Sequence, residues 1–321
     1  MNKFVYVDTL STAEVIPLLG PETRPLAGGT DLLPLMKEGI VAPPSLVNVK
    51  HLDELRFLRE EADGLHIGAL TTLHELDRSP VVRERYTALA DACGQSASPQ
   101  LRNMATLGGN LLQQVRCWYY RGDFKCWMKG GDVCHARGGE NQFHAIFDQS
   151  PCIAVYPSDP PAALVALDAT VRIVGPRGER TASVAELLQP PAEERRQMHL
   201  LAADELIVEI MVPVPSGRSV YLKAMDRAAW AYALASVAVS ARVEGGRMQD
   251  VRIVLGGVAN VPVRATEAES IVEGNPVDTD LARRAGTAAL QGAVALEQNG
   301  YKLSLVRNLV AQALLDLAAH G

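Results

Sequence analysis

Four cysteines within one 36-residue window are the side chains of this sequence best suited to bind a metal: Cys117, Cys126, Cys134 and Cys152. Thiolates are preferred ligands of iron–sulfur clusters and of structural zinc. The gaps of eight, seven and seventeen residues are not the C-x-x-C spacing of zinc ribbons or bacterial ferredoxins. On spacing alone, a metal centre and a set of buried structural thiols are both open.

Two glycine-rich turns could hold a phosphate. The first turn is Ala27-Gly28-Gly29-Thr30-Asp31, which lies between a predicted strand and a predicted helix. The second is Thr106-Leu107-Gly108-Gly109-Asn110, which also has two adjacent glycines. Paired glycines let the backbone approach a ligand, and the free N–H groups at a helix start bind anions. One such loop could be a tight turn with Thr30 or Asp31 as the N-cap, but two of them suggest a diphosphate held from both sides. Neither loop is G-x-G-x-x-G or a P-loop, so Rossmann and Walker sites are disfavoured.

The cysteine window coincides with a segment that has no helical or strand period, residues 117–151. Loops of this length are uncommon inside compact domains and are usually functional or disordered. Two tryptophans, two tyrosines and three cysteines argue against disorder. His135 and His144 in this loop could be ligands, but with four cysteines at hand we expect them beside the ligands or on the surface. Cys93 lies on a predicted helix and is expected to pack in the core.

Short strands and helices are predicted on both sides of that loop. Ser11 is the N-cap of a helix that runs to about residue 19, with Glu14 completing a capping box. A helical stretch over 71–93 is broken at Ser79-Pro80. Further helices are predicted at about 32–37, 278–297 and 303–319, and strands at 4–7, 45–49, on either side of Asp63-Gly64, 152–156, 163–174, 204–215 and in a hairpin joined by Glu244-Gly245-Gly246. The Pro-rich end of 204–215 is the best candidate for a domain boundary.

Composition excludes several classes of function. The chain has 31 Lys+Arg against 37 Asp+Glu, a net charge of −6, whereas a nucleic-acid binder would need a basic face. No apolar run reaches the roughly 18 residues of a membrane span, and the N-terminus lacks the apolar core of a signal peptide. Five cysteines, an odd number, fit reduced thiols. The expected compartment is the cytoplasm, or the periplasm only by export together with a partner subunit.

Four motifs, in this order, resemble those of one protein family. They are AGGTDLLPLMK (27–37), SPQLRNMATLGGNL (98–111), PSD (157–159) and the lysine of YLKAMDRAAWAYALASVAV (221–239). Over nearly its whole length the chain resembles the FAD-binding medium subunit of the molybdenum hydroxylases, the xanthine dehydrogenase and carbon monoxide dehydrogenase family. The resemblance implies an α+β fold with an FAD-binding domain of the vanillyl-alcohol oxidase type. Its two subdomains would be 1–57 and 58–216, the second containing the cysteine-rich loop 117–151, and a small α+β domain, an antiparallel sheet packed on helices, would follow at 217–321.

The resemblance also implies which residues bind FAD. The diphosphate would lie between the glycine turns, Asp159 would bind the ribityl or ribose side, and Lys223 would lie near the ribityl chain and the isoalloxazine. From their sequence context alone, Asp159 is interpreted as a turn residue before two prolines, and Lys223 as a solvent-exposed lysine on a strand. The implied cofactor-binding residues are Ala27, Gly28, Gly29, Thr30, Asp31, Thr106, Gly108, Gly109, Asn110, Asp159 and Lys223. No catalytic residue is implied, because the substrate would bind to another subunit.

Most flavin subunits of the family pass almost directly from the TLGGN stretch to the PSD stretch, whereas this chain has the added segment 117–151. A similar insertion is found in the β subunit of 4-hydroxybenzoyl-CoA reductase and in the flavin subunit of a bacterial periplasmic aldehyde oxidoreductase, which this segment resembles more. In both, four cysteines bind a [4Fe-4S] cluster. The resemblance thus implies that Cys117, Cys126, Cys134 and Cys152 are cluster ligands.

The function implied is that of an electron-transfer subunit in an oxidoreductase. A large partner subunit would hold the molybdenum cofactor, a small one would hold two [2Fe-2S] clusters, and electrons would leave through FAD to an external acceptor. Oxidation of an aldehyde or N-heterocycle is favoured; a 4-hydroxybenzoyl-CoA reductase-like subunit working reductively is the alternative. A free-standing flavoprotein oxidase would need a substrate domain, for which the residues after 216 are too few. A metal-binding scaffold that had lost FAD would not need its intact glycine pairs.

Overall fold

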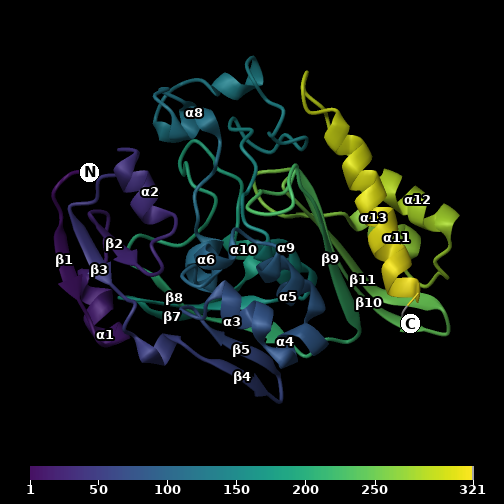
Figure 1. The fold of residues 1–321 in the computed structure, drawn as a ribbon, viewed down its shortest axis with the longest axis horizontal. Helices are drawn as coiled ribbons and strands as arrows, with labels where there is room; N and C mark the ends of the chain where they lie inside the picture. The colour runs from purple at the N-terminus through teal and green to yellow at the C-terminus, as the bar shows by residue number, and fades with distance from the viewer. Residues whose placement is uncertain (320–321) are drawn as a thin grey trace.

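The structure is a computed structural model that describes residues 1–319. Three β-sheets follow one another along the chain, and Figure 1 shows the N-terminal sheet on one side, the second in the middle and the third on the other side. The segment 112–158 runs over the helices of the middle part, at the top of this view. Within residues 1–319, no helix is both long and apolar enough to cross a membrane.

The N-terminal sheet is parallel and has three strands. Its order is β1 (Val5–Asp8), β3 (Ser45–Asn48) and β2 (Thr23–Leu26). Helix α1 (Thr12–Val15) is capped by the Ser11 side chain, as predicted, but the Glu14 carboxylate accepts from the Leu10 N–H, so the capping box is not complete. A 3₁₀ turn that contains Pro17 follows at Ile16–Leu18, so the α-helix is shorter than predicted. Helix α2 (Leu32–Lys37) has the predicted bounds.

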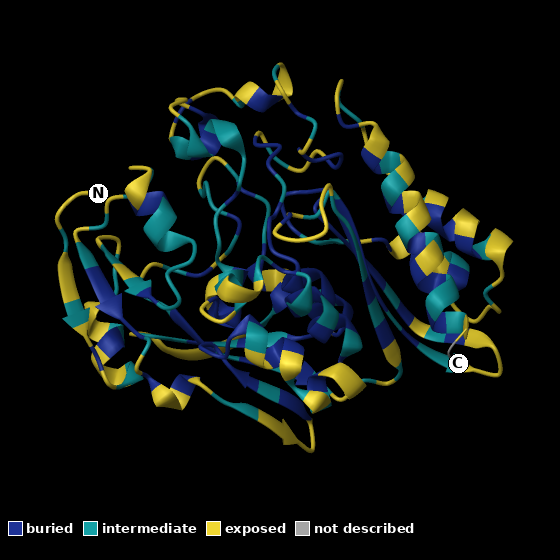
Figure 2. Ribbon diagram, viewed as in Figure 1, coloured by how far each residue is buried: buried dark blue, intermediate teal, exposed yellow. Residues whose placement is uncertain are grey.

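The middle sheet is antiparallel, with five strands. Its order is β4 (Leu58–Glu61), β5 (Gly64–Gly68), β8 (Leu206–Pro213), β6 (Thr170–Gly175) and β7 (Gly178–Ser183). The helices that accompany it are α3 (Leu73–Arg78), α4 (Pro80–Arg85), α5 (Thr87–Gly94), α6 (Pro99–Arg102), α7 (Leu107–Leu111), α9 (Pro160–Ala166) and α10 (Val184–Leu187). The predicted break at Ser79-Pro80 is confirmed, because the Ser79 side chain caps α4 and Pro80 occupies its first turn. Figure 2 shows these helices buried where they face the sheet.

The C-terminal sheet is also antiparallel, in the order β12 (Val263–Arg264), β11 (Arg247–Gly256), β10 (Ala235–Glu244) and β9 (Arg218–Ala224). Helices α11 (Thr266–Val272), α12 (Thr279–Ala288) and α13 (Tyr301–Ala319) cover one face, as Figure 1 shows. Helices α5 and α9 pack against the other face. The predicted β10–β11 hairpin is confirmed, with positive φ at Gly245 and Gly246 as a tight two-residue turn requires. The α+β class with an antiparallel sheet packed on helices is confirmed.

Three predicted elements are wrong or misplaced. Residues 152–156 form no strand, because their backbone groups pair with scattered partners such as Ala145, Ala259 and the side chain of Asn260. The predicted strand 163–174 begins only at 170, because Pro160 in the first turn and the alanines after it start α9. Helix α12 ends at 288 rather than 297, and a turn with Gly292 at positive φ follows it.

The cysteine-rich loop has little regular structure, as predicted: helix α8 (Trp118–Arg121) and two 3₁₀ turns. It is nevertheless tied to the C-terminal domain. The N–H groups of Ile146 and Phe147 both donate to the Val258 carbonyl, at 2.9 and 3.2 Å. Asn141 and Gln298 exchange two hydrogen bonds, at 3.1 and 3.2 Å. The loop is therefore ordered by segments more than 100 residues away along the chain.

Candidate functional site: two glycine loops and a cysteine-lined cavity

The two predicted glycine loops meet in the structure. Gly28 lies so close to the second loop that a Cβ there would overlap the Met104 carbonyl. Gly29 has a φ of +70°, which strains other residues. The second loop enters α7, where the Thr106 hydroxyl accepts from the Gly109 N–H at 3.3 Å. The pairing of the loops that a shared diphosphate would need is thus present.

The two glycines of the second loop differ in what surrounds them. A Cβ on Gly108 would meet Ala69 at 2.9 Å, so this residue lets the loop pack on the chain after β5. A Cβ on Gly109 would meet only the Thr106 hydroxyl within 4 Å. One side of Gly109 is therefore open, and a ligand could approach the backbone there. The first N–H groups of α7 are already used, because those of Leu107 and Gly108 donate to the carbonyls of Thr71 and Ala69.

Asp31, predicted at the diphosphate, has other partners. Its carboxylate accepts from the Gln114 N–H at 2.7 Å and pairs with Arg116 and Arg121, each at 2.8 Å. Asp31 therefore ties the first glycine loop to the chain that follows the second. Neither arginine was predicted from the sequence, although a cation just before Cys117 and next to a predicted diphosphate site is a usable signal. Within residues 1–319, the buried Nε of Arg116 has no hydrogen-bond partner.

Asp159 and Lys223 come together in the interior. The carboxylate accepts from the Lys223 ammonium at 2.8 Å, from the Tyr221 hydroxyl at 2.7 Å and from Ser96 at 3.2 Å. Lys223 also donates to the carbonyls of Gln95 and Ala231, and its side chain is fully buried. The reading of Lys223 as a solvated lysine is therefore wrong. The pair joins β9 to the start of α9, and Ser158 beside it donates to the side chain of Asn110 in the second glycine loop.

Replacing Lys223 with methionine is expected to lower the free energy of unfolding by about 3–5 kcal/mol, because it leaves the Asp159 carboxylate buried without its cation. A double Lys223→Met, Asp159→Leu variant should recover part of the loss. Arg177→Met is the control, since its pair with Asp204 is exposed and worth about 0.2–1 kcal/mol. Urea unfolding of the three variants tests this. A Lys223→Met midpoint equal to that of Arg177→Met would refute a buried pair.

The four predicted cysteines line one cavity in the loop, together with aromatic side chains such as Tyr120 and Trp127. Two of them are buried and two are partly exposed. Backbone N–H groups lie toward three of the sulfurs. The N–H groups of Tyr119 and Tyr120 lie toward Cys117, and the N–H groups of Ala136 and Ile153 lie toward Cys134. The N–H group of Ala154 lies toward Cys152. Such donors stabilise thiolates. Cys93, by contrast, lies in the core on α5, as predicted.

Burial and hydrogen bonding set the acidity of these thiols. Burial raises the pKa of Cys117 to about 11 and raises that of Cys93 as well. The hydrogen bond between the sulfurs of Cys134 and Cys152 lowers the pKa of Cys134 and raises that of Cys152, because one proton serves both. A bound metal would displace these protons outright.

The spacing of the sulfurs fits a cluster better than a single ion. Four thiolates around one zinc at 2.3 Å would lie about 3.8 Å apart. Among residues 1–319, the only set of three or more His, Cys, Asp or Glu with ligand atoms all within 4.8 Å of one another is Glu61, Asp63 and His66, at the β4–β5 hairpin. A cubane presents four iron atoms and holds its thiolates further apart than one ion does. Four cysteine thiols around one cavity are the kind of donor set that iron–sulfur clusters use.

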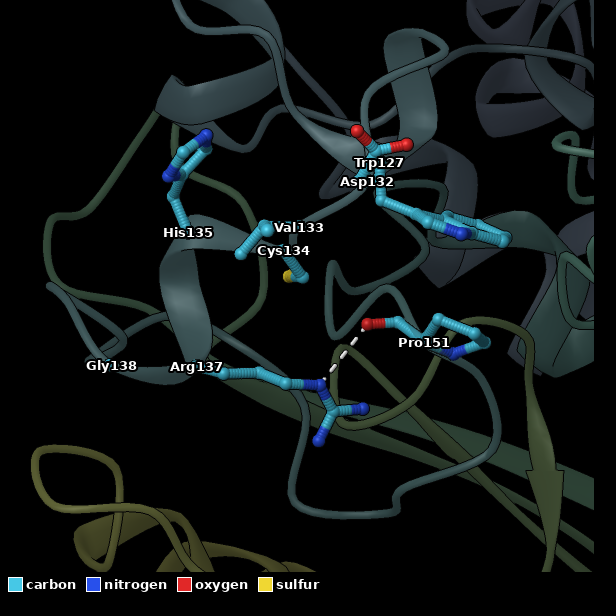
Figure 3. A pocket seen from close by; sticks show the side chains of 8 residues that line it. All are labelled: Trp127, Asp132, Val133, Cys134, His135, Arg137, Gly138 and Pro151. Atoms are coloured by element: carbon cyan, nitrogen blue, oxygen red, sulfur yellow. Dashed lines mark hydrogen bonds between the residues drawn. The ribbon is translucent and has the colours of Figure 1, made fainter.

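A recess of about 600 Å³ opens beside Cys134 (Figure 3). Arg137 lies at its edge, paired through two hydrogen bonds with Asp148 and donating to the Pro151 carbonyl at 3.1 Å. His135 also lines the recess and is exposed. His144 is buried instead, with its Nε2 3.2 Å from the Cys117 sulfur. Burial, and then the Lys302 ammonium, lower the pKa of His144 to about 4.

Two family profiles match almost the whole chain. One, described as the FAD binding domain in molybdopterin dehydrogenase, matches residues 2–215; the other, the CO dehydrogenase flavoprotein C-terminal domain, matches residues 220–317. The chain belongs to the FAD-binding subunits of the molybdenum hydroxylases. The resemblance stated from the motifs is thereby confirmed, and FAD is the cofactor of this flavin subunit.

Relatives of this flavin subunit are parts of oxidoreductases. The aldehyde oxidoreductase FAD-binding subunit PaoB of Escherichia coli (strain K12) is 35% identical, with 100% of both chains covered. The carbon monoxide dehydrogenase medium chain of Hydrogenophaga pseudoflava is 29% identical over 97% of this chain and 96% of that one. The solved carbon monoxide dehydrogenase from Hydrogenophaga pseudoflava that lacks the Mo-pyranopterin moiety matches with a TM-score of 0.78 at 28% identity, covering 99% of this chain and 98% of that one. This flavin subunit is therefore an oxidoreductase component.

Proposed function

We propose that this chain is the FAD and [4Fe-4S] subunit of a molybdenum-dependent aldehyde oxidoreductase. The observation that supports the cluster is the single cavity lined by Cys117, Cys126, Cys134 and Cys152. The aldehyde class rests on the 35% identity to the FAD-binding subunit of an aldehyde oxidoreductase. That relative favours the oxidative direction over a 4-hydroxybenzoyl-CoA reductase-like activity.

We place the FAD diphosphate against the open side of Gly109. Ala27–Asp31 would lie on the other side of it, with Arg116 as a cation nearby. Gly28 and Gly108 lack a Cβ that would prevent the two loops from packing closely on their neighbours. The side chains of Thr106 and Asn110 stabilise the second loop by hydrogen bonds. The buried Asp159–Lys223 pair positions the backbone near the ribityl side. When bound, FAD supplies one-electron and two-electron redox chemistry.

The chain would work between partners. It would accept electrons from a small subunit with two [2Fe-2S] clusters, which receives them from a large subunit with the molybdenum cofactor, and would pass them to an external acceptor. Carbon monoxide dehydrogenase relatives are named medium chains. The division into 1–57, 58–216 and 217–321 is part of this proposal: two FAD-binding subdomains, the second containing the cysteine-rich loop 117–151, and then a C-terminal domain.

The test is the cofactor content and the activity of the purified chain, alone and with its partners. Alone, it should carry FAD with about four irons and four labile sulfides per flavin, and it should not oxidise aldehydes. Adding the large and small subunits should confer aldehyde oxidation. Aldehyde oxidation by this chain alone would refute the subunit assignment, and zinc without labile sulfide would refute the cluster.

A further inference from the structure

His144 is a buried polar ring inside an aromatic shell. Only 3% of the residue is exposed, and its ring contacts those of Trp118 at 5.5 Å and Tyr119 at 6.4 Å between centroids. A phenylalanine would suit such surroundings by shape and polarity. Some polar contact must therefore offset the cost of burying an imidazole here.

That contact is the sulfur of Cys117. His144 Nε2 lies 3.2 Å from Cys117 Sγ, which is the only hydrogen bond of the ring among the described residues. Nδ1 is buried with no partner within residues 1–319. The proton is therefore best placed on Nε2, where it faces the sulfur, because a proton on Nδ1 would be a buried donor with nothing to donate to.

The backbone around His144 is held from the C-terminal domain. Asn299 donates to the carbonyls of His144 and Ala145, at 3.3 and 3.0 Å. Lys302 donates to the carbonyls of Phe143 and Gly257, at 3.0 and 2.8 Å. Asn299 and Lys302 are both fully buried. The backbone on the His144 side of the contact is therefore held by α13 and the turn before it.

We propose that His144 is a positioning residue that raises the reduction potential of the iron–sulfur centre by donating its Nε2–H to the Cys117 thiolate. This inference rests on the proposed function, since it requires the cluster. Reduction adds one electron, and hence one negative charge, to the cluster and its thiolates. A hydrogen bond to a ligand sulfur stabilises that more negative state, so the potential rises.

The test is a redox titration of the complete complex, followed by the EPR signal of the reduced cluster, with dithionite as the reductant. His144→Phe keeps the ring and removes the N–H donor. We expect it to keep its iron and to lower the reduction equilibrium constant about tenfold, a shift of about −59 mV for a one-electron couple. His144→Gln, whose amide can donate from the position of Nε2, should recover most of the shift.

His51→Phe is the control, because His51 is exposed and lies outside the cysteine-rich loop. It should leave the potential unchanged. An unshifted potential in His144→Phe with full iron would overturn the inference. Loss of iron in both His144 variants would also overturn it, because His144 would then be a ligand. Absence of iron and labile sulfide from the unaltered complex would instead refute the proposed function.

Discussion

Replacing Cys126 with serine is expected to remove nearly all iron and labile sulfide while most of the FAD stays. Cys126 is buried in the cysteine cavity, and a serine would fit its place sterically. The backbone there is fixed by its own turn, since the Cys126 carbonyl accepts from the N–H groups of Lys129 and Gly131, at 3.0 Å each. The variant therefore loses a ligand while keeping the local turn. The glycine loops lie outside the segment 117–151, with the Arg121–Asp31 pair as a link between the two, so we expect most of the flavin to stay bound.

The loop should also become sensitive to protease in this variant. Apart from the cavity, the first half of the loop has few aliphatic side chains to bury, so the proposed cluster would supply much of its stability. Limited trypsin digestion should cut faster after Lys125 or Lys129 in this variant than in the unaltered protein. Cys93→Ala is the matched control, because it removes a thiol from the core of α5, outside the cavity, and should retain the full iron content. Equal iron in Cys126→Ser and Cys93→Ala would contradict the ligand assignment.

Replacing Gly109 with valine is expected to lower bound FAD at least tenfold. A Cβ on Gly109 meets only the Thr106 hydroxyl, at 3.0 Å, and its φ is not positive, so the chain can accommodate the side chain. The valine methyl groups would then occupy the open side of the loop, where the diphosphate is proposed to approach. The measurement is the ratio of flavin absorbance to protein after gel filtration, with circular dichroism to confirm that the fold is kept.

Gly20→Val is the control for this variant. A Cβ on Gly20 meets nothing within 4 Å, its φ is not positive, and it lies outside both glycine loops. It should retain full FAD. A Gly109→Val protein with as much FAD as Gly20→Val would show that the diphosphate does not lie against this loop.

Local signals in the sequence predicted a large part of the fold. Caps, turns and breaks depend on neighbours a few residues apart, so Ser11, the Ser79-Pro80 break and the Gly245-Gly246 turn were predicted where the structure has them. The strand predicted at 152–156 failed for the opposite reason. Its apolar residues are buried, but their hydrogen-bond partners come from distant segments that form no ladder there. Burial alone does not distinguish such a segment from a strand.

The sequence by itself determined the composition of the candidate sites: two glycine loops that let backbones approach closely, four cysteines in one segment and, through the family resemblance, an aspartate and a lysine. Only the tertiary structure decided how these residues are paired. Asp31 lies against two arginines about 90 residues away, and the Asp159–Lys223 pair closes in the interior. His144 reaches Cys117 because Asn299 and Lys302 hold its backbone from the C-terminal domain. Charges and hydrogen bonds act over a few ångströms in space, whereas residue spacing along the chain reports only on neighbours within a turn or a strand.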